Sequence, residues 1–193
     1  MARRNDARRA ALVDAAIEVL AREGARGLTF RAVDAQAGVP LGTASNYFTG
    51  RDDLFTQAGA RVYERLIPDE ATVAGQEVAG RDRETYVRLM RELVGRVSAF
   101  RTGYLALLEL RLEATRRPAL REVLTARVRA DVDANVAYHE ASGLPGDGTG
   151  VKLLILTLNW LIVEQLTLPE LFTEEEREEL VRAAVERIVP PDA

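Results

Sequence analysis

Small and polar side chains gather at Thr43-Ala44-Ser45-Asn46, a tetrapeptide with almost no capacity to build a core. The hydroxyls of Thr43 and Ser45 and the amide of Asn46 can donate or accept hydrogen bonds at the edges of DNA bases, and asparagine is suited to adenine. Ala44 is small enough to admit a thymine methyl group, and Gly42 allows the backbone to approach closely. This combination indicates contacts with bases in a groove of duplex DNA.

Two short helices are predicted to position the tetrapeptide. Helical spacing of apolar residues places them at residues 31–37 and 41–47, joined by a Gly-Val-Pro turn at residues 38–40. Helices of this length do not survive alone, so both must pack on the longer helix predicted at residues 6–23. Two short helices around a turn with glycine form the helix-turn-helix pattern. We therefore expect the second helix, which begins at Leu41, to lie in the major groove.

The distribution of charge agrees with this interpretation. The whole chain has a formal net charge of -4, but residues 1–51 carry eight arginines against five acidic residues, a net charge of +3. The rest of the chain is acidic, with a net charge of -7. A basic segment on an acidic body can attract a polyanion at one end only. The N-terminal arginines are either a solvated tail or a flexible arm that neutralises phosphates; they are Arg3, Arg4, Arg8 and Arg9.

An enzyme is the main alternative, for example a helical protein with a metal held by carboxylates. Glu109 and Glu113 share one helical face, but His139 is the only histidine, so two Glu-x-x-His motifs are impossible. We interpret both glutamates as surface charges. The sequence has no cysteine and no nucleophile-elbow, P-loop or dinucleotide motif. We expect no catalytic residue, metal or cofactor, while a helical small-molecule-binding protein or enzyme without DNA affinity stays open.

The rest of the chain also predicts helices. Apolar residues recur at helical spacing between glycines and prolines, and no segment alternates like a strand, so we expect an all-α fold of about nine helices. The predicted division is a helix-turn-helix DNA-binding domain at residues 1–51 and a helical domain at residues 52–193. The predicted helices are residues 6–23, 31–37, 41–47, 52–66, 81–98, 102–115, 118–141, 150–168 and 174–188.

Residues 10–55 resemble the DNA-binding domain of the TetR family of bacterial regulators. The matching run is LTFRAVDAQAGVPLGTASNYFTGRDDLF, from Leu28 to Phe55, in which glycine, aromatic and charged positions all coincide. The resemblance implies that Tyr47 and Arg51 contact DNA phosphates and that Arg31 lies near the DNA backbone. The DNA contacts expected in all are Arg31, Leu41, Gly42, Thr43, Ala44, Ser45, Asn46, Tyr47 and Arg51.

Two positions depart from the family pattern. Asp34 stands where the family commonly has a small alanine, which leaves the packing of the two short helices open there. Capping of a neighbouring helix end is the alternative role for Asp34. Ser45 replaces a frequent aromatic residue, so a contact of that ring is lost and we expect a different operator preference.

The resemblance further implies a ligand-responsive repressor that binds a palindromic operator as a dimer. Helices between residues 81 and 141 would enclose the pocket for an unidentified small-molecule effector. The candidate lining residues are Tyr86, Met90, Phe100, Tyr104, Leu108 and Arg111. Their helical spacing fits a plain hydrophobic core at least as well.

The two C-terminal helices, residues 150–168 and 174–188, are the expected homodimer interface. The first is apolar nearly all round and approaches the length of a membrane span, but it contains Lys152 and Glu164 and lacks the flanking charges of a span. We therefore expect this helix to be buried within its subunit and against a partner, with Trp160 mostly buried. The first residues lack the apolar run of a secretory signal, so the expected location is the cytoplasm, with no membrane association.

Overall fold

The computed structural model describes residues 2–66 and 80–190, and all regular elements in these two ranges are helical. The prediction of an all-α fold is therefore confirmed. The elements are α1 (Ala2–Gly27), α2 (Phe30–Gln36), the 3-10 helix η1 (Ala44–Asn46), α3 (Arg51–Leu66), α5 (Arg83–Ala99), α6 (Arg101–Ala114), α7 (Pro118–Ser142), α8 (Gly148–Thr167) and α9 (Glu174–Ile188).

The chain forms two compact units. One consists of Met1–Ile67 and Phe100–Arg127, and the other of Pro68–Ala99 and Val128–Ala193, so α7 contributes to both. The first unit groups α3 and α6 with the helix-turn-helix segment. The division into a DNA-binding domain at residues 1–51 and a helical domain at residues 52–193 stays a prediction.

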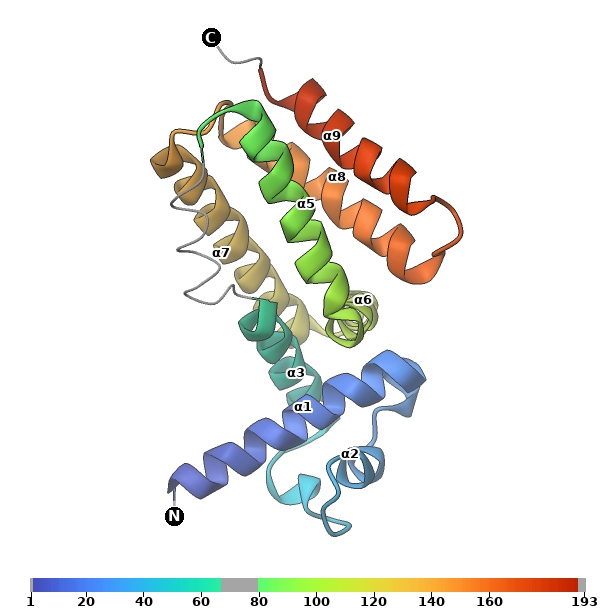
Figure 1. The fold of residues 1–193 in the computed structure, drawn as a ribbon. Helices are drawn as coiled ribbons and strands as arrows, with labels where there is room; N and C mark the ends of the chain where they lie inside the picture. Colours follow the sequence, from blue (N-terminus) through green and yellow to red (C-terminus); the bar gives the residue numbers. More distant parts are fainter. Residues whose placement is uncertain (1, 67–79, 191–193) are drawn as a thin grey trace. The chain divides into compact units, whose positions relative to one another are not determined.

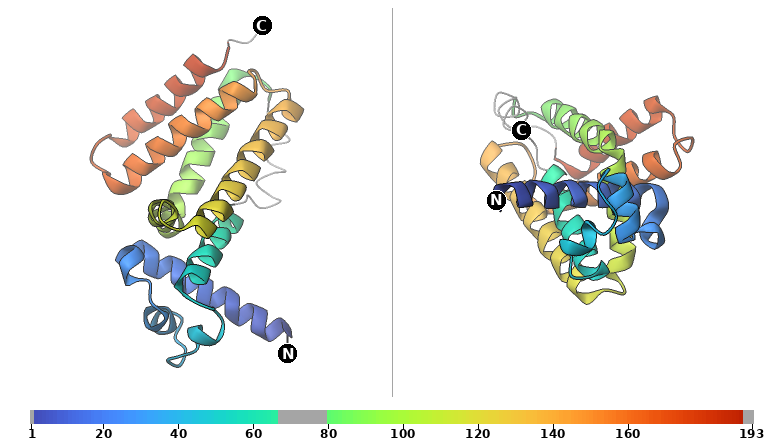
Figure 2. Two further views of the ribbon diagram at one scale, coloured as in Figure 1. Left: turned by 180° about the vertical axis from the view of Figure 1, so that it is seen from behind. Right: turned by 90° about the horizontal axis from the view of Figure 1, so that it is seen from below.

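In the first unit, α1 is the central helix. It packs on α6, α2 and α3, as Figures 1 and 2 show. Its apolar face is fully buried and includes Leu12, Ile17 and Leu20. The helix starts at Ala2, earlier than predicted, so the backbone of the N-terminal arginines belongs to α1; the side chains of Arg3 and Arg4 lie outside the described part.

The predicted α-helix at residues 41–47 is wrong. This segment is a hydrogen-bonded turn followed by the single 3-10 turn of η1. The physical reason is Gly42, whose φ of +87° is left-handed and cannot belong to a right-handed helix. The helix α2 starts at Phe30, one residue before the predicted start, because the Thr29 hydroxyl caps it by accepting from the Ala32 amide at 3.1 Å.

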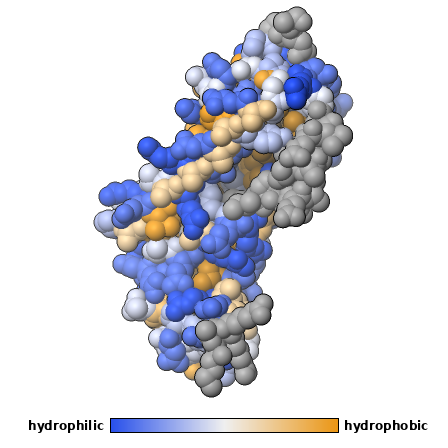
Figure 3. Space-filling view, turned by 90° about the vertical axis from the view of Figure 1, so that its left-hand side faces the viewer, coloured by the Kyte–Doolittle hydropathy of each residue, from blue (hydrophilic) through white to orange (hydrophobic). Residues whose placement is uncertain are grey.

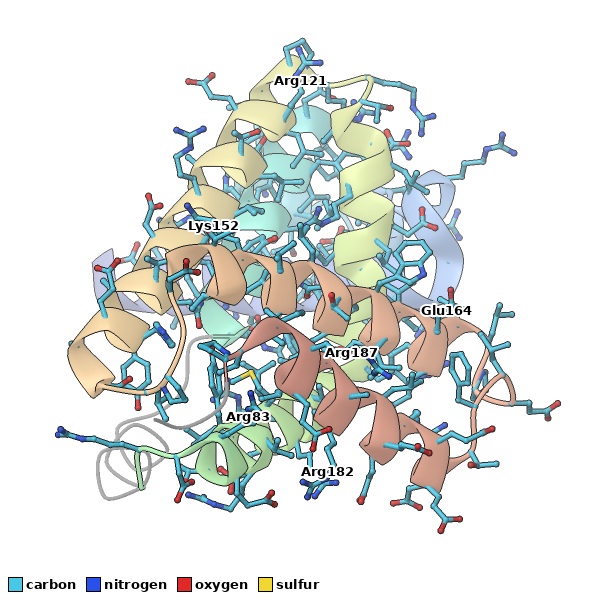
Figure 4. The ribbon with its side chains drawn as sticks, turned by 90° about the horizontal axis from the view of Figure 1, so that it is seen from above. Arg83, Arg121, Lys152, Glu164, Arg182 and Arg187 are labelled. Carbon is cyan, nitrogen blue, oxygen red and sulfur yellow. The ribbon has the colours of Figure 1, made fainter. Side chains whose placement is uncertain are left out.

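In the second unit, α5, α8 and α9 lie side by side (Figures 1 and 4). Tyr86, Val87, Leu154, Val185 and Val189 form its buried centre. Polar contacts also join α5 to the C-terminal helix. Arg182, labelled in Figure 4, binds Glu84 through two hydrogen bonds of 2.8 and 2.9 Å, and Arg83 donates to the carbonyl of Val189 at 2.7 Å.

Local signals define the ends of α8 and α9. Asp147 caps α8 by accepting from the Gly150 amide, and α9 begins at Glu174, as predicted, where Thr173 and Glu176 form a complete capping box. By length and composition alone α8 could cross a membrane, a property that core helices of soluble proteins share. Leu154 and Ile162 on one side of α8 are buried within the unit.

The other side of α8 faces outward. Trp160 is 65% exposed, so the expectation that it is mostly buried is wrong within a single chain. Leu153 and Leu156 are exposed beside it at helical spacing. The apolar residues of α8 thus divide between a face inside the subunit and a face that the subunit leaves uncovered.

The outer face of α7 carries five exposed alanines at helical spacing. In Figure 3 they form a pale stripe on an otherwise mostly polar face. Alanine is the strongest helix former, so this face favours a long helix without needing a packing partner. The alanines are Ala126, Ala130, Ala134, Ala137 and Ala141.

Candidate nucleic-acid interface

The tetrapeptide turn is held by a buried carboxylate. Asp34 on α2 is only 1% exposed, and its two oxygens accept from the amides of Gly42 and Ala44, each at 2.7 Å. This confirms the capping role that the sequence offered for Asp34. Because each oxygen satisfies one backbone donor, the carboxylate fixes the turn before η1 relative to α2.

The exposed side of this turn consists of Leu41, Gly42, Ser45 and Asn46, and Leu41 is 71% exposed. The Ser45 hydroxyl donates to the Gly42 carbonyl at 2.8 Å, and the half-buried Thr43 hydroxyl donates to the Pro40 carbonyl at 2.5 Å. Both hydroxyls therefore donate their hydrogen atoms within the turn, and their oxygens can still accept hydrogen bonds from DNA.

Ala44 differs from its expected role. Its side chain is fully buried in the core of the first unit, where Phe48 is also buried. A buried methyl group cannot reach a base edge, so we correct the assignment of Ala44 from thymine contact to packing. The segment keeps one exposed apolar side chain of suitable chemistry, Leu41.

Arg51, expected at a phosphate, makes contacts inside the protein. Its Nε donates to the carbonyl of Leu28 at 2.9 Å, and one Nη donates to the carbonyl of Ala25. The guanidinium also lies 5.4 Å from the centre of the Phe55 ring. These contacts hold the connection between α1 and α2, while a phosphate contact by Arg51 stays a prediction. Arg31 is exposed on α2.

Arg9 lies in a position that the helix-turn-helix motif did not indicate. Its guanidinium lies 5.8 Å from the ring centres of both Tyr47 and Phe48, and it donates to Gln57 at 3.3 Å. Arg9 precedes Leu12 and Val13 by one helical turn, and that spacing could have placed it on the inner side of α1. The half-buried Tyr47 thus has a cation over its ring directly after residues 41–46, which we call the recognition segment.

A second carboxylate organises the loop after η1. Asp53 accepts from Gln57 at 2.7 Å and from the Thr49 amide at 2.9 Å. Burial works against ionisation of Asp53, but these hydrogen bonds outweigh it and lower the pKa of its carboxyl below the ordinary value. The loop is therefore tied to α3 by a charged group.

The candidate effector residues fall into two sets. Phe100, Tyr104, Leu108 and Arg111 belong to the first unit, whereas Tyr86 and Met90 belong to the second. Burial raises the pKa of both Tyr86 and Tyr104 to about 12, so their hydroxyls stay protonated near neutral pH. Arg111 donates to the Tyr63 hydroxyl at 3.4 Å. Their role as pocket lining stays a prediction.

The two glutamates considered for a metal have protein partners. Glu113 is buried and accepts from Arg116 at 2.5 Å and Arg117 at 2.8 Å, so its interpretation as a surface charge is wrong. Hydrogen bonds from Arg116 and Arg117 lower the pKa of Glu113, against the opposing effect of burial. Glu109 accepts from the backbone amide of Ala25 at 2.8 Å.

Two family models match the chain. The model of bacterial regulatory proteins of the tetR family matches residues 12–58, and the model of the tetracyclin repressor-like C-terminal domain matches residues 81–191. A curated relative from Xanthobacter autotrophicus, an uncharacterised HTH-type transcriptional regulator in the dhlA 5′ region, is 36% identical over 85 residues. That alignment covers 44% of this chain and 42% of the relative, so the match spans less than half of either protein.

Solved structures match nearly the whole chain. The multidrug binding protein EbrR complexed with ethidium is 30% identical, with a TM-score of 0.69 over 95% of this chain and 99% of that chain. A TetR family member from Streptomyces coelicolor A3 is 31% identical, with a TM-score of 0.67 over 95% and 98%. A TetR-family regulator from Mesorhizobium loti MAFF303099 has a TM-score of 0.76 over 94% and 95% but is 18% identical, which concerns the fold alone.

Proposed function

Because the chain belongs to the TetR family of bacterial transcriptional regulators, we propose that it is a ligand-responsive repressor that binds a palindromic operator as a homodimer. Its matched domains are those of transcriptional regulators, which supports a regulatory role over a catalytic one. The observation that carries the proposal is the turn at residues 41–46, which the buried Asp34 carboxylate holds while Leu41, Ser45 and Asn46 stay exposed.

In this proposal the exposed turn reads bases. Asn46 offers a donor and an acceptor together, the pair that matches the N6 and N7 atoms of adenine. Ser45 and Thr43 offer accepting lone pairs, because their protons are bound within the turn. Leu41 replaces Ala44 as the candidate for a thymine methyl. Phosphate contacts fall to Arg31, to Tyr47 and to any part of Arg51 that its carbonyl partners leave free.

We assign dimerisation to the uncovered face of α8 and α9. Leu153, Leu156 and Trp160 on α8 and Leu180 on α9 are all exposed in the single chain. Exposed apolar side chains at helical spacing favour an interaction site, and two-fold helix-turn-helix dimers present paired recognition elements to paired half-sites. Figure 4 shows the two helices side by side, with Lys152 and Glu164 on α8 and Arg187 on α9.

Selection of bound sequences from random duplex DNA should enrich a palindrome. Asn46→Ala should then cost about 1 to 3 kcal/mol at particular base pairs, because only base contacts carry sequence information. Arg31→Ala should weaken binding to all sequences and reduce the salt slope by about one. Enrichment of no sequence would contradict the proposal, and equal losses of specific and non-specific binding in both variants would contradict the two assigned roles.

We propose a small-molecule effector that favours the state unable to bind DNA. An effector shifts the equilibrium only by its differential affinity for the two states, with a typical coupling of about 1 to 3 kcal/mol. The effector is unidentified, but the similar protein EbrR has been crystallised with ethidium, which makes that aromatic cation a sensible probe. We place the protein and this regulation in the cytoplasm.

Ethidium should bind the isolated protein, measured by its fluorescence without DNA because the dye intercalates. If α6 lines the site, Tyr104→Ala should weaken ethidium binding about tenfold, the factor for about 1.4 kcal/mol. Arg101→Ala, which alters an exposed residue of the same helix, is the control. Equal affinities of the wild-type and Tyr104→Ala proteins would remove Tyr104 from the pocket.

A further inference from the structure

The connection between α1 and α2 has an unusual backbone. Gly24 interrupts α1 with φ +68° and ψ -177°, so the chain kinks before Ala25. A φ in this range favours glycine. The kink breaks the helical hydrogen-bond ladder, which leaves the donors and acceptors of the following residues in need of other partners.

A carboxylate from α6 takes the donor at this kink. Glu109 Oε2 accepts from the Ala25 amide at 2.8 Å, across 84 positions of sequence. A Cβ atom on Gly24 would lie only 3.3 Å from the same oxygen, so the absence of a side chain there leaves room for the carboxylate. Ala25 itself is buried in the core of the first unit.

A guanidinium from α3 takes the acceptors. Arg51 donates to the carbonyls of Ala25 and Leu28. Ala25 is therefore held at its amide by an anion from α6 and at its carbonyl by a cation from α3. Hydrogen bonds to charged groups are shorter and stronger than neutral ones, so the connection that leads into α2 is fixed from both sides.

We propose that Glu109 is a positioning residue through which α6 sets the orientation of the recognition segment. The inference rests on the proposed function, since it concerns operator binding. The kink leads directly into α2, and α2 supplies the Asp34 carboxylate that holds the turn before η1. One path of backbone and carboxylate contacts thus runs from α6 to the exposed face of Asn46.

Because Glu109 lies on α6, this contact can link movement of α6 to operator binding. Tyr104, Leu108 and Arg111, three of the candidate effector residues, belong to the same helix. A shift or rotation of α6 would displace the carboxylate from the Ala25 amide. Base contacts require alignment to within the length of a hydrogen bond, whereas phosphate attraction does not, so the specific part of DNA binding would respond first.

The test compares binding of full-length variants to the selected operator and to a scrambled duplex at one salt concentration. Glu109→Met keeps the length of the side chain but removes the acceptor, and it should weaken operator binding about tenfold, equivalent to about 1.4 kcal/mol. Binding to the scrambled duplex should change less than about twofold, because phosphate contacts remain. Glu109→Gln keeps an acceptor oxygen and should restore operator affinity to within about threefold of wild type.

Thr102→Val is the matched control, because the Thr102 hydroxyl donates to Glu18 on α1 at 3.1 Å and joins the same two helices away from the kink. It should lower thermal stability without changing the ratio of specific to scrambled affinity. An equal loss of this ratio in Thr102→Val, or an unchanged ratio in Glu109→Met, would overturn the inference. A wild-type protein that selects no operator would instead contradict the proposed function.

Hydrogen exchange at Ala25 keeps the inference testable if Glu109→Met does not fold. In the wild-type protein this amide should exchange more slowly with operator bound than without it. The reason is that operator binding requires the hydrogen bond between the Ala25 amide and Glu109. The amide of Arg177 on α9, bonded to the carbonyl of Thr173 at 3.0 Å, serves as an internal reference. Exchange at Ala25 that does not respond to the operator would overturn the inference.

Discussion

Asp34→Ala should strongly weaken specific operator binding and destabilise the protein. The substitution removes both acceptors of the Gly42 and Ala44 amides, and the Ala44 amide lies in a buried contact. Loss of hydrogen bonds to a buried charged group should reduce the free energy of unfolding by about 2 to 4 kcal/mol. Specific affinity should fall about a hundredfold, the factor for about 2.8 kcal/mol, since the turn loses its fixed position. Denaturant unfolding and operator titration measure the two effects.

Asp34→Asn is a milder substitution at the same position. An amide side chain keeps one accepting oxygen but turns a second donor toward a backbone N–H, so it should lie between the wild type and Asp34→Ala in both measurements. Asp133→Ala is the matched control, because Asp133 is an exposed carboxylate on α7. If Asp34→Ala unfolds at the same denaturant concentration as the wild type, the capping role of Asp34 is contradicted.

Leu156→Glu should convert the proposed dimer to monomers. Leu156 is 69% exposed in the single chain, so the substitution costs the isolated subunit little. In a two-fold interface each subunit would bury one introduced carboxylate, and an unpaired buried charge costs several kcal/mol unless it is protonated. The dimer dissociation constant should rise at least about a hundredfold, equivalent to about 2.8 kcal/mol. Light scattering across protein concentrations measures this shift.

Val185→Glu, at a buried position, is the control for Leu156→Glu at an exposed one. Val185 on α9 is fully buried and belongs to the core of its own subunit with Leu154 and Tyr86. A charge there should unfold the second unit and cannot report on dimerisation. Leu156→Glu should in contrast keep its helical circular dichroism and melting behaviour while losing operator affinity, since two half-sites then bind separately. A folded Leu156→Glu protein that remains a dimer would place the interface elsewhere.

Features that depend on neighbours in the chain could be predicted from the sequence. The helices follow from apolar spacing, and the start at Thr173 follows from the Glu176 three residues later. The family resemblance at residues 28–55 also lies within one continuous run, and it correctly indicated the TetR family. Periodicity identifies an apolar face, and that information is present in each segment alone.

Partners distant in the chain were decided only by the tertiary structure. Gly42 lies in a segment with helical spacing, yet its left-handed φ and the Asp34 carboxylate turn the expected helix into η1. Arg51 meets carbonyls 23 and 26 positions away, and Glu109 meets an amide 84 positions away. A long polar side chain has many partners within reach in an unfolded chain, so only the packed helices select one.

The sequence also could not predict which apolar side chains of a helix are buried. Trp160 and Leu154 belong to the same strongly apolar helix, but Leu154 is inside the subunit while Trp160 is exposed. Val185 and Leu180 divide in the same way on α9. Periodicity gives the angle between side chains around a helix and not the direction from which the neighbouring helix approaches. That direction is set when α5, α8 and α9 pack together, and it decides which apolar side chains build the core and which remain exposed.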